Sequence, residues 1–135
     1  MNAERNEFML LFRGTDWYKA VSPEQTQKIA ADWGAWYRQL TADGKVAAGS
    51  PLECSGKVVS GKGGHVISDG PFAESKEAIG GYFLLTVDTM DEAVTIAQQC
   101  PGLPFGLKVE VRQVMDACPM ITEAVGKPQL AEAMA

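Results

Sequence analysis

The residues best suited to chemistry lie in the stretch SDGPFAESKEAIGG, from Ser68 to Gly81. Glu74, Lys76 and Glu77 place two carboxylates around one lysine in this short span. Held beside a cavity, such a group binds a polar or anionic ligand or moves protons, with shifted pKa values where it is partly buried. Asp69, just upstream, is the best candidate for a catalytic base in such a site.

The same stretch also has a purely structural interpretation. An aspartate bonds nearby backbone amides, and Gly70 and Pro71 set a bend, so the turn needs no catalytic explanation for Asp69. Phe72 anchors such a turn to a core, and the charges that follow can be solvated. On spacing alone we favour structure over function here, and both interpretations stay open.

Two residues outside the stretch are further ligand-binding candidates. His65 is the only histidine, the residue type most often used as a base near neutral pH, although its place beside a glycine-rich turn favours an exposed strand residue. Arg112 shares a strand face with Glu110, and its planar guanidinium suits a carboxylate ligand. A solvent face or an ion pair with a partner subunit explains it equally. No second His or Cys stands at ligand spacing, so we expect no metal site.

Composition excludes several classes of protein. The chain has 135 residues and a formal net charge of −5, which argues against nucleic-acid binding because phosphates need a basic patch. No apolar run reaches the roughly 20 residues that span a bilayer, and the N-terminus does not read as a signal peptide. Three cysteines without paired spacing are typical of free thiols. We therefore expect a cytoplasmic protein without membrane or nucleic-acid partners.

Periodicity predicts the elements. A helix begins at the N-cap Ser22, with Gln25 completing a capping box, and stops at Gly44; a second begins at Thr89 and ends at Pro101. Strands are predicted at residues 7–14, 45–49, 57–60, 65–68, 81–88 and 107–114, the third and fourth joined by a glycine-rich turn. With that hairpin set aside, the order is βαββαβ, an α+β ferredoxin-like fold with a hairpin insertion.

Two predicted strands are apolar on both faces. Residues 8–12 and 82–87 carry apolar side chains at nearly every position. Both helices of this fold lie on one face of the sheet, so something else must exclude water from the other. We therefore expect a homodimer packed face to face.

Aromatic residues mark the first helix and the loop before it. Trp33, Trp36 and Tyr37 recur at helical spacing, which favours core packing over a stacking platform. Trp17 and Tyr18 precede the helix and are freer to line a pocket.

Several segments together resemble a known family. DGPFAESKEAIGGYFLL is similar to the signature of the DGPF branch of the YCII-related family, with Ser75 where that branch usually has Thr. MLLFRGTDW, GKVAAGSPL, DEAVTIAQQCPGL and VEVR resemble the same family. The resemblance covers Phe8 to Cys118, which indicates one domain over residues 1–118 and a C-terminal tail at 119–135. It implies a bacterial protein with the dimeric α+β barrel fold.

The resemblance also implies a range of functions. Some YCII relatives are thought to use a His–Asp pair in a cleft near the dimer interface, and a few act on small organic acids as isomerases or lyases. The histidine of that pair falls on the first helix, where this chain reads ADWGAW and offers Asp32; the aspartate corresponds to Asp69. Genes of the DGPF branch often lie beside extracytoplasmic-function sigma factors, which implies a regulatory or accessory alternative.

We therefore expect a homodimer whose cleft binds a small polar or anionic molecule, without a cofactor. An enzyme of this kind would use proton-transfer chemistry of the isomerase or lyase type. The alternative is a non-catalytic module that binds a protein partner such as a sigma factor.

Overall fold

The computed structural model describes residues 6–14, 17–53, 55–70, 78–115 and 120. Short 3₁₀ helices occupy Trp17–Ala20, Lys62–Gly64 and Leu103–Phe105. The main elements, in chain order, are β1 (Asn6–Arg13), α1 (Pro23–Ala42), β2 (Val46–Pro51), β3 (Lys57–Ser60), β4 (Val66–Asp69), β5 (Ile79–Val87), α2 (Met90–Ala97) and β6 (Lys108–Gln113).

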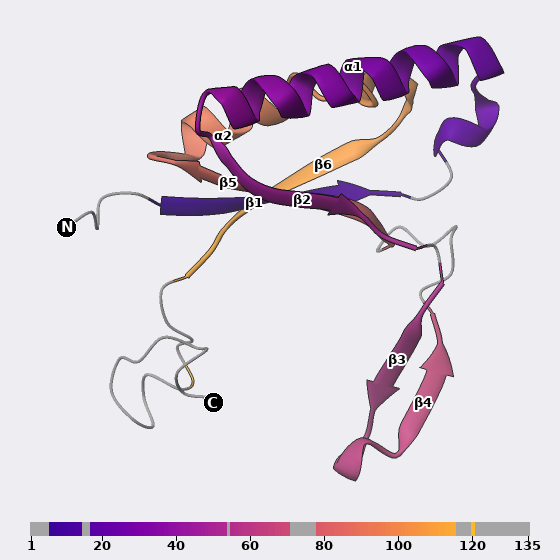
Figure 1. Ribbon diagram of the computed structural model, residues 1–135. Coiled ribbons are helices and arrows are strands. Elements are labelled where there is room, and N and C mark those ends of the chain that lie inside the picture. Colours follow the sequence, from indigo (N-terminus) through magenta and orange to yellow (C-terminus); the bar gives the residue numbers. More distant parts are fainter. Residues whose placement is uncertain (1–5, 15–16, 54, 71–77, 116–119, 121–135) are drawn as a thin grey trace.

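Four strands form one antiparallel sheet in the order β2-β5-β1-β6. Both helices, α1 and α2, lie on one face of this sheet, and in the described part of the chain neither covers the other face (Figure 1). With β3 and β4 set aside, the order of elements is βαββαβ. The predicted ferredoxin-like α+β fold with a hairpin insertion is therefore confirmed.

Alternation along the two central strands builds the core. Successive side chains of a strand point to opposite faces, so every second residue of β1 and β5 faces the helices. Those residues are buried, whereas the residues between them on the opposite face, which we call the open face, are only half-buried. The buried set is Phe8, Leu10, Phe12, Phe83, Leu85 and Val87; the apolar residues of the open face are Met9, Leu11, Tyr82 and Leu84.

The predicted helix starts are present. The Ser22 hydroxyl accepts a hydrogen bond from the Gln25 N–H at 3.2 Å, and the Gln25 side chain accepts one from the Ser22 N–H at 3.2 Å. Thr89 caps α2 in the same way, accepting from the Glu92 N–H at 3.1 Å. These bonds satisfy N–H groups that have no partner inside the helix, which fixes where each helix begins.

The hairpin of β3 and β4 forms a separate two-stranded sheet. Gly61, Gly63 and Gly64 all have positive φ, a conformation that side chains with a Cβ rarely adopt, and together they reverse the chain. The hairpin projects from the sheet on the side opposite α1 (Figure 1). It therefore takes no part in the core that the helices cover.

Neither described helix combines the length and apolarity required to cross a bilayer.

Candidate functional site: an aromatic cleft beneath the first helix

A cleft of about 680 Å³ opens between α1 and the sheet. We call it the aromatic cleft. Its walls come from α1, from the 3₁₀ helix at Trp17–Ala20 and from the adjoining ends of β1, β2 and β5. The described lining residues are Phe12, Gly14, Trp17, Thr26, Ile29, Ala30, Trp33, Gly34, Tyr37, Gly49, Ser50, Pro51, Leu52, Gly80, Gly81 and Phe83.

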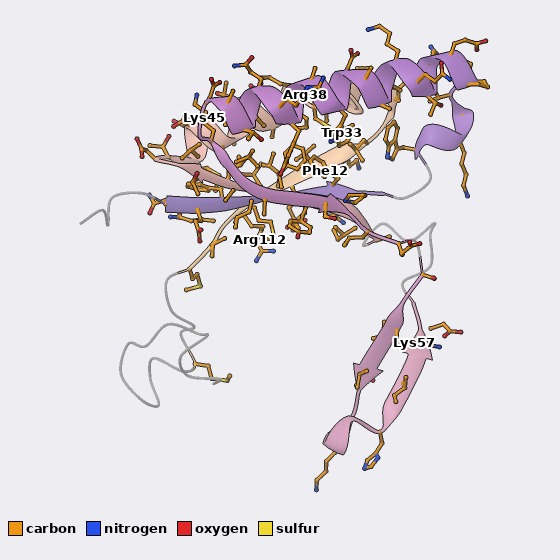
Figure 2. The ribbon with its side chains drawn as sticks, viewed as in Figure 1. Phe12, Trp33, Arg38, Lys45, Lys57 and Arg112 are labelled. Atoms are coloured by element: carbon orange, nitrogen blue, oxygen red, sulfur yellow. The ribbon has the colours of Figure 1, made fainter. Side chains whose placement is uncertain are left out.

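Helical spacing aims one face of α1 into this cleft. Residues four apart lie one above another on a helix, so Ile29, Trp33 and Tyr37 form a continuous row. All three line the cleft. Figure 2 shows Trp33 between α1 and the sheet, close to Phe12 of β1. The apolar row that was predicted to pack in the core therefore also makes the roof of the cleft.

Aromatic contacts hold the walls in place. Trp17 stacks on Trp33 with ring centroids 6.2 Å apart and planes 22° from parallel. Phe12 meets Trp33 edge to face at 5.0 Å, and Tyr37 meets Phe83 at 5.0 Å. Offset-stacked and edge-to-face pairs are the favourable arrangements for aromatic rings. The walls are thus ordered by their own packing and present flat ring surfaces.

Glycines allow the strands and helix to come close without filling the cleft. A Cβ on Gly49 would lie 2.7 Å from Phe83 Cδ1 and 3.0 Å from Tyr37 Cε1, so only glycine fits there. A Cβ on Gly81 would lie 3.0 Å from the carbonyl oxygen of Ser50 on the neighbouring strand. Gly34 stands in the middle of α1, where alanine would be the better helix former. Its missing side chain leaves space beneath the helix.

The described lining is almost wholly apolar and contains no charged side chain. The polar side chains are those of Thr26, Tyr37 and Ser50. Two of them already donate locally: the Thr26 hydroxyl to the Ser22 carbonyl at 3.0 Å, and the Ser50 hydroxyl to the Pro51 carbonyl at 3.2 Å. The cleft therefore suits a ligand with a flat apolar body rather than one that is charged throughout.

The predicted base and the predicted histidine lie on the hairpin. Asp69 ends β4, and its carboxylate pairs with the Lys57 ammonium across the two strands. The Asp69 side chain is 81% exposed. His65 follows the glycine turn and is also exposed. Neither residue lines the aromatic cleft of its own protomer.

The other described candidates lie on different surfaces. Arg112 of β6 is exposed on the open face and lies 3.3 Å from Glu110, which in turn lies 3.1 Å from Arg13 (Figure 2). Asp32 is on the solvent side of α1, 3.0 Å from Lys28. One protomer therefore does not bring Asp32, His65, Asp69 and Arg112 together at one site.

Glu74, Lys76 and Glu77 lie outside the described residues, as do Cys54 and Cys118. Among the residues that are described, no group of His, Cys, Asp or Glu side chains could hold a metal ion.

Cys100 is the free cysteine that the structure describes; it follows α2 in the chain and is buried. Burial raises the pKa of its thiol to about 11, and hydrogen bonds with the backbone of Gly102 and Leu103 offset only part of that rise. A thiol of this kind stays protonated at neutral pH and is a poor nucleophile.

The sequence indicated several residues that line the cleft, but it did not predict the cleft itself. Trp17 was predicted to be free to line a pocket, and it does so. Trp33 was assigned to the core, and it is half-buried against both the core and the cleft. The missing signal was the set of glycines Gly49, Gly80 and Gly81, whose meaning depends on the register of β2 and β5, in which Gly49 pairs with Phe83 and Gly81 with Pro51.

Comparison with known proteins finds a family match and a related sequence. The sequence matches the YCII-related domain over residues 8–118. An uncharacterized protein of Rhizobium meliloti (strain 1021) is 32% identical over 82 residues, which is 58% of this chain. That match spans 66% of the relative's own length, just short of two thirds.

One solved structure is similar in outline. It is 5-chloro-2-hydroxyhydroquinone dehydrochlorinase (TftG) from Burkholderia phenoliruptrix AC1100, in complex with 2,5-dihydroxybenzoquinone. The two chains superpose with a TM-score of 0.48 and share 17% identity, over 82% of this chain and 95% of the other.

Proposed function

The chain belongs to the YCII-related domain family, and from that premise we propose that it binds a small molecule in the aromatic cleft. The observation that carries this proposal is the cleft itself: about 680 Å³, walled by ordered rings and kept open by glycines. Small-molecule sites typically measure 300–1,000 Å³ and are concave and mostly apolar.

The lining favours a ligand with one flat ring and one polar group. The flat faces of Trp17 and Trp33, whose planes lie 22° from parallel, suit stacking on a ring. We propose that the polar end is anionic, as in a small aromatic acid, and that Lys76, in the run of Glu74, Lys76 and Glu77, is the group that pairs with it. Support comes from chain position: the Ala78 carbonyl accepts a hydrogen bond from the cleft residue Gly14 at 2.9 Å, and Glu77 immediately precedes Ala78.

We also propose that the working form is a homodimer in the cytoplasm. The open face of the sheet carries Met9, Leu11, Tyr82 and Leu84, and no described helix covers it. A second copy packed on the same face would remove these side chains from water, as in the dimeric α+β barrel. The sequence Asp-Gly-Pro-Phe at positions 69–72 supports assignment to the DGPF branch.

Catalysis, in this proposal, is proton transfer of the isomerase or lyase type with Asp69 as the base. Within one protomer Asp69 does not line the cleft, so this role requires a second copy to bring the carboxylate to a bound ligand. Replacing Asp69 with Asn in a folded dimer removes the base and keeps the shape. Full turnover in that variant would exclude Asp69 from catalysis while leaving the binding proposal intact.

The binding proposal is tested by a thermal-shift screen of small aromatic and aliphatic acids, followed by titration of tryptophan fluorescence. A ligand that binds only the folded state raises the melting temperature, and a ring stacked on Trp17 or Trp33 quenches their emission. We expect aromatic acids to do both and aliphatic acids of the same charge to do neither.

A matched pair of variants on α1 locates the site. Gly34→Val fills the cleft, whereas Ala35→Val makes the same β-branched residue on the exposed side of the same helix. We expect Gly34→Val to weaken binding at least tenfold and Ala35→Val to change it less than twofold. Equal affinities in the two variants would place the ligand elsewhere. Recovery of a stoichiometric protein partner from cells, with no ligand retained, would instead support the accessory-module alternative.

A further inference from the structure

The β3–β4 hairpin, residues 57–69, is the most exposed ordered part of the described chain; we call it the arm. Every residue of both strands is exposed. Its four branched aliphatic side chains, Val58, Val59, Val66 and Ile67, are between 46% and 65% exposed. Isolated two-stranded hairpins are marginally stable in water, and large exposed apolar side chains on one are typical of a surface that is covered in the working assembly.

Register divides the arm into two faces. Val59 lies directly opposite Ile67, and Lys57 lies directly opposite Asp69 two residues along, so these two pairs share one face. Val58 and Val66 lie on the other face. There the Val58 side chain is a neighbour of Gly70, and the Val66 side chain is a neighbour of Gly61. The Val59–Ile67 face is the more exposed and combines an apolar centre with an ion pair at its edge. Protein interfaces have the same arrangement.

The charges of the arm and of the rest of the chain, which we call the body, favour a second copy of the chain as the partner that covers the arm. Two lysines and one aspartate give the arm a formal charge of +1. The net charge of the chain is −5, so the residues outside the arm carry a formal charge of −6. Unlike charges favour contact between the arm and the body of a second copy, while two arms repel each other weakly.

Geometry points the same way. The arm projects on the side of the sheet that carries the open face, the surface on which a second copy is proposed to pack (Figure 1). Two sheets packed face to face lie about 10 Å apart, and a strand of four residues spans roughly 13 Å. An arm that leaves the sheet on that side is therefore long enough to run past the partner's sheet.

We propose that the arm is a clasp: its Val59–Ile67 face docks on the body of a second copy, alongside the contact between the two open faces. This inference rests on the proposed homodimer and adds a second, separate contact to it. Asp69 pairs with Lys57 at the base of the arm, on the same face as Val59 and Ile67, so this contact lies beside it.

Sedimentation equilibrium of paired variants tests the clasp. The double variant Val59→Thr/Ile67→Thr keeps β-branched residues, and hence strand propensity, but removes the apolar contact. Val58→Thr/Val66→Thr makes a matched change on the opposite face of the same arm. We expect the first to raise the dimer dissociation constant at least tenfold and the second to change it less than threefold. Circular dichroism and the fluorescence of the cleft tryptophans report that each variant is folded.

Hydrogen exchange supplies an independent measurement. Amides at 57–60 and 66–69 are expected to exchange slowly above the dissociation constant and rapidly below it, since the arm alone opens easily. Fast exchange at every concentration, or a dimer that both double variants leave unchanged, would overturn the clasp and leave the open-face dimer standing. A wild-type chain that is monomeric throughout would overturn the clasp and the homodimer together, while ligand quenching of the cleft tryptophans would still report on the binding proposal.

Discussion

The described residues form two antiparallel sheets of opposite character. In the four-stranded sheet, Leu10 and Leu85 of the central strands are fully buried beneath the helices. In the two-stranded arm, every residue of both strands is exposed. Both are held by antiparallel backbone pairing, so hydrogen bonding alone does not distinguish them. The difference shows that stability in this chain comes from covering a sheet face, and that the apolar side chains of the arm contribute only when something covers them.

The sharpest way to break this comparison is to truncate one apolar residue in each sheet. Leu85→Ala deletes a fully buried side chain and should lower the free energy of unfolding by about 3 kcal/mol. Val59→Ala should lower it by less than about 0.5 kcal/mol when measured below the concentration at which copies associate. Urea denaturation measures both. Equal losses would mean that the arm is covered within one protomer.

Gly49 tests how tightly the covered face is packed. Gly49→Ala places a Cβ 2.7 Å from Phe83 Cδ1 and should cost about 2 kcal/mol by overpacking. The control is Gly34→Ala, where the nearest atom is the mobile end of Arg38 at 3.2 Å and the gain in helix propensity should stabilise by up to about 1 kcal/mol. Thermal melts that move in the same direction for both variants would contradict the packing described for β2.

The buried thiol of Cys100 makes the stability of the covered core depend on pH. Burial raises the pKa of the thiol from 9.0 to about 11, so the folded state holds its proton more tightly than the unfolded chain. The resulting stabilisation is fully present below pH 9 and is lost as pH rises through about 11, a loss of roughly 1 to 2 kcal/mol. Denaturation from pH 8 to pH 11 measures it. Cys100→Ala should remove this component, and an unchanged pH profile in that variant would assign it to other groups.

The smallest effect is expected at the ion pair of the arm. Asp69 and Lys57 are both mostly exposed, and exposed pairs contribute little because water and salt screen them. Asp69→Asn should change the free energy of unfolding of the protomer by less than about 0.5 kcal/mol at physiological salt. A larger loss in urea melts of dilute protein would show that the pair is shielded within one chain.

Local patterns predicted the elements well. The apolar runs at residues 8–12 and 82–87, the caps at Ser22 and Thr89 and the glycines of the hairpin all act over a few residues, and they form the expected strands, helix starts and turn. α2 ends at Ala97, four residues before the predicted stop at Pro101. β2 extends further than predicted, through Pro51, because its pairing with Gly81 continues beyond the apolar run.

The cleft could not be predicted in the same way. It depends on Trp17, Trp33, Gly49 and Gly81 meeting across a helix, a turn and two strands, and no local pattern links them. The charged residues chosen from spacing were assigned by chemical type. In the structure, Asp32 pairs with Lys28 on α1 and Arg112 pairs with Glu110 on β6, so their nearest described partners are neighbours on their own element. A role for them in a shared site remains a prediction about the dimer.

The strand order also determines when each pair of strands can form while the chain is being synthesised. β1 is made first yet lies in the interior of the sheet, between β5 and β6. Its pairing with β6 waits until Gln113 has been made, on the order of 5 to 20 seconds later at ribosomal speeds. The arm pairs residues close in sequence and closes within microseconds. A nascent chain therefore samples the hairpin, with its exposed valines, well before it has a core, which makes the ribosome-bound stage the period of greatest risk of aggregation.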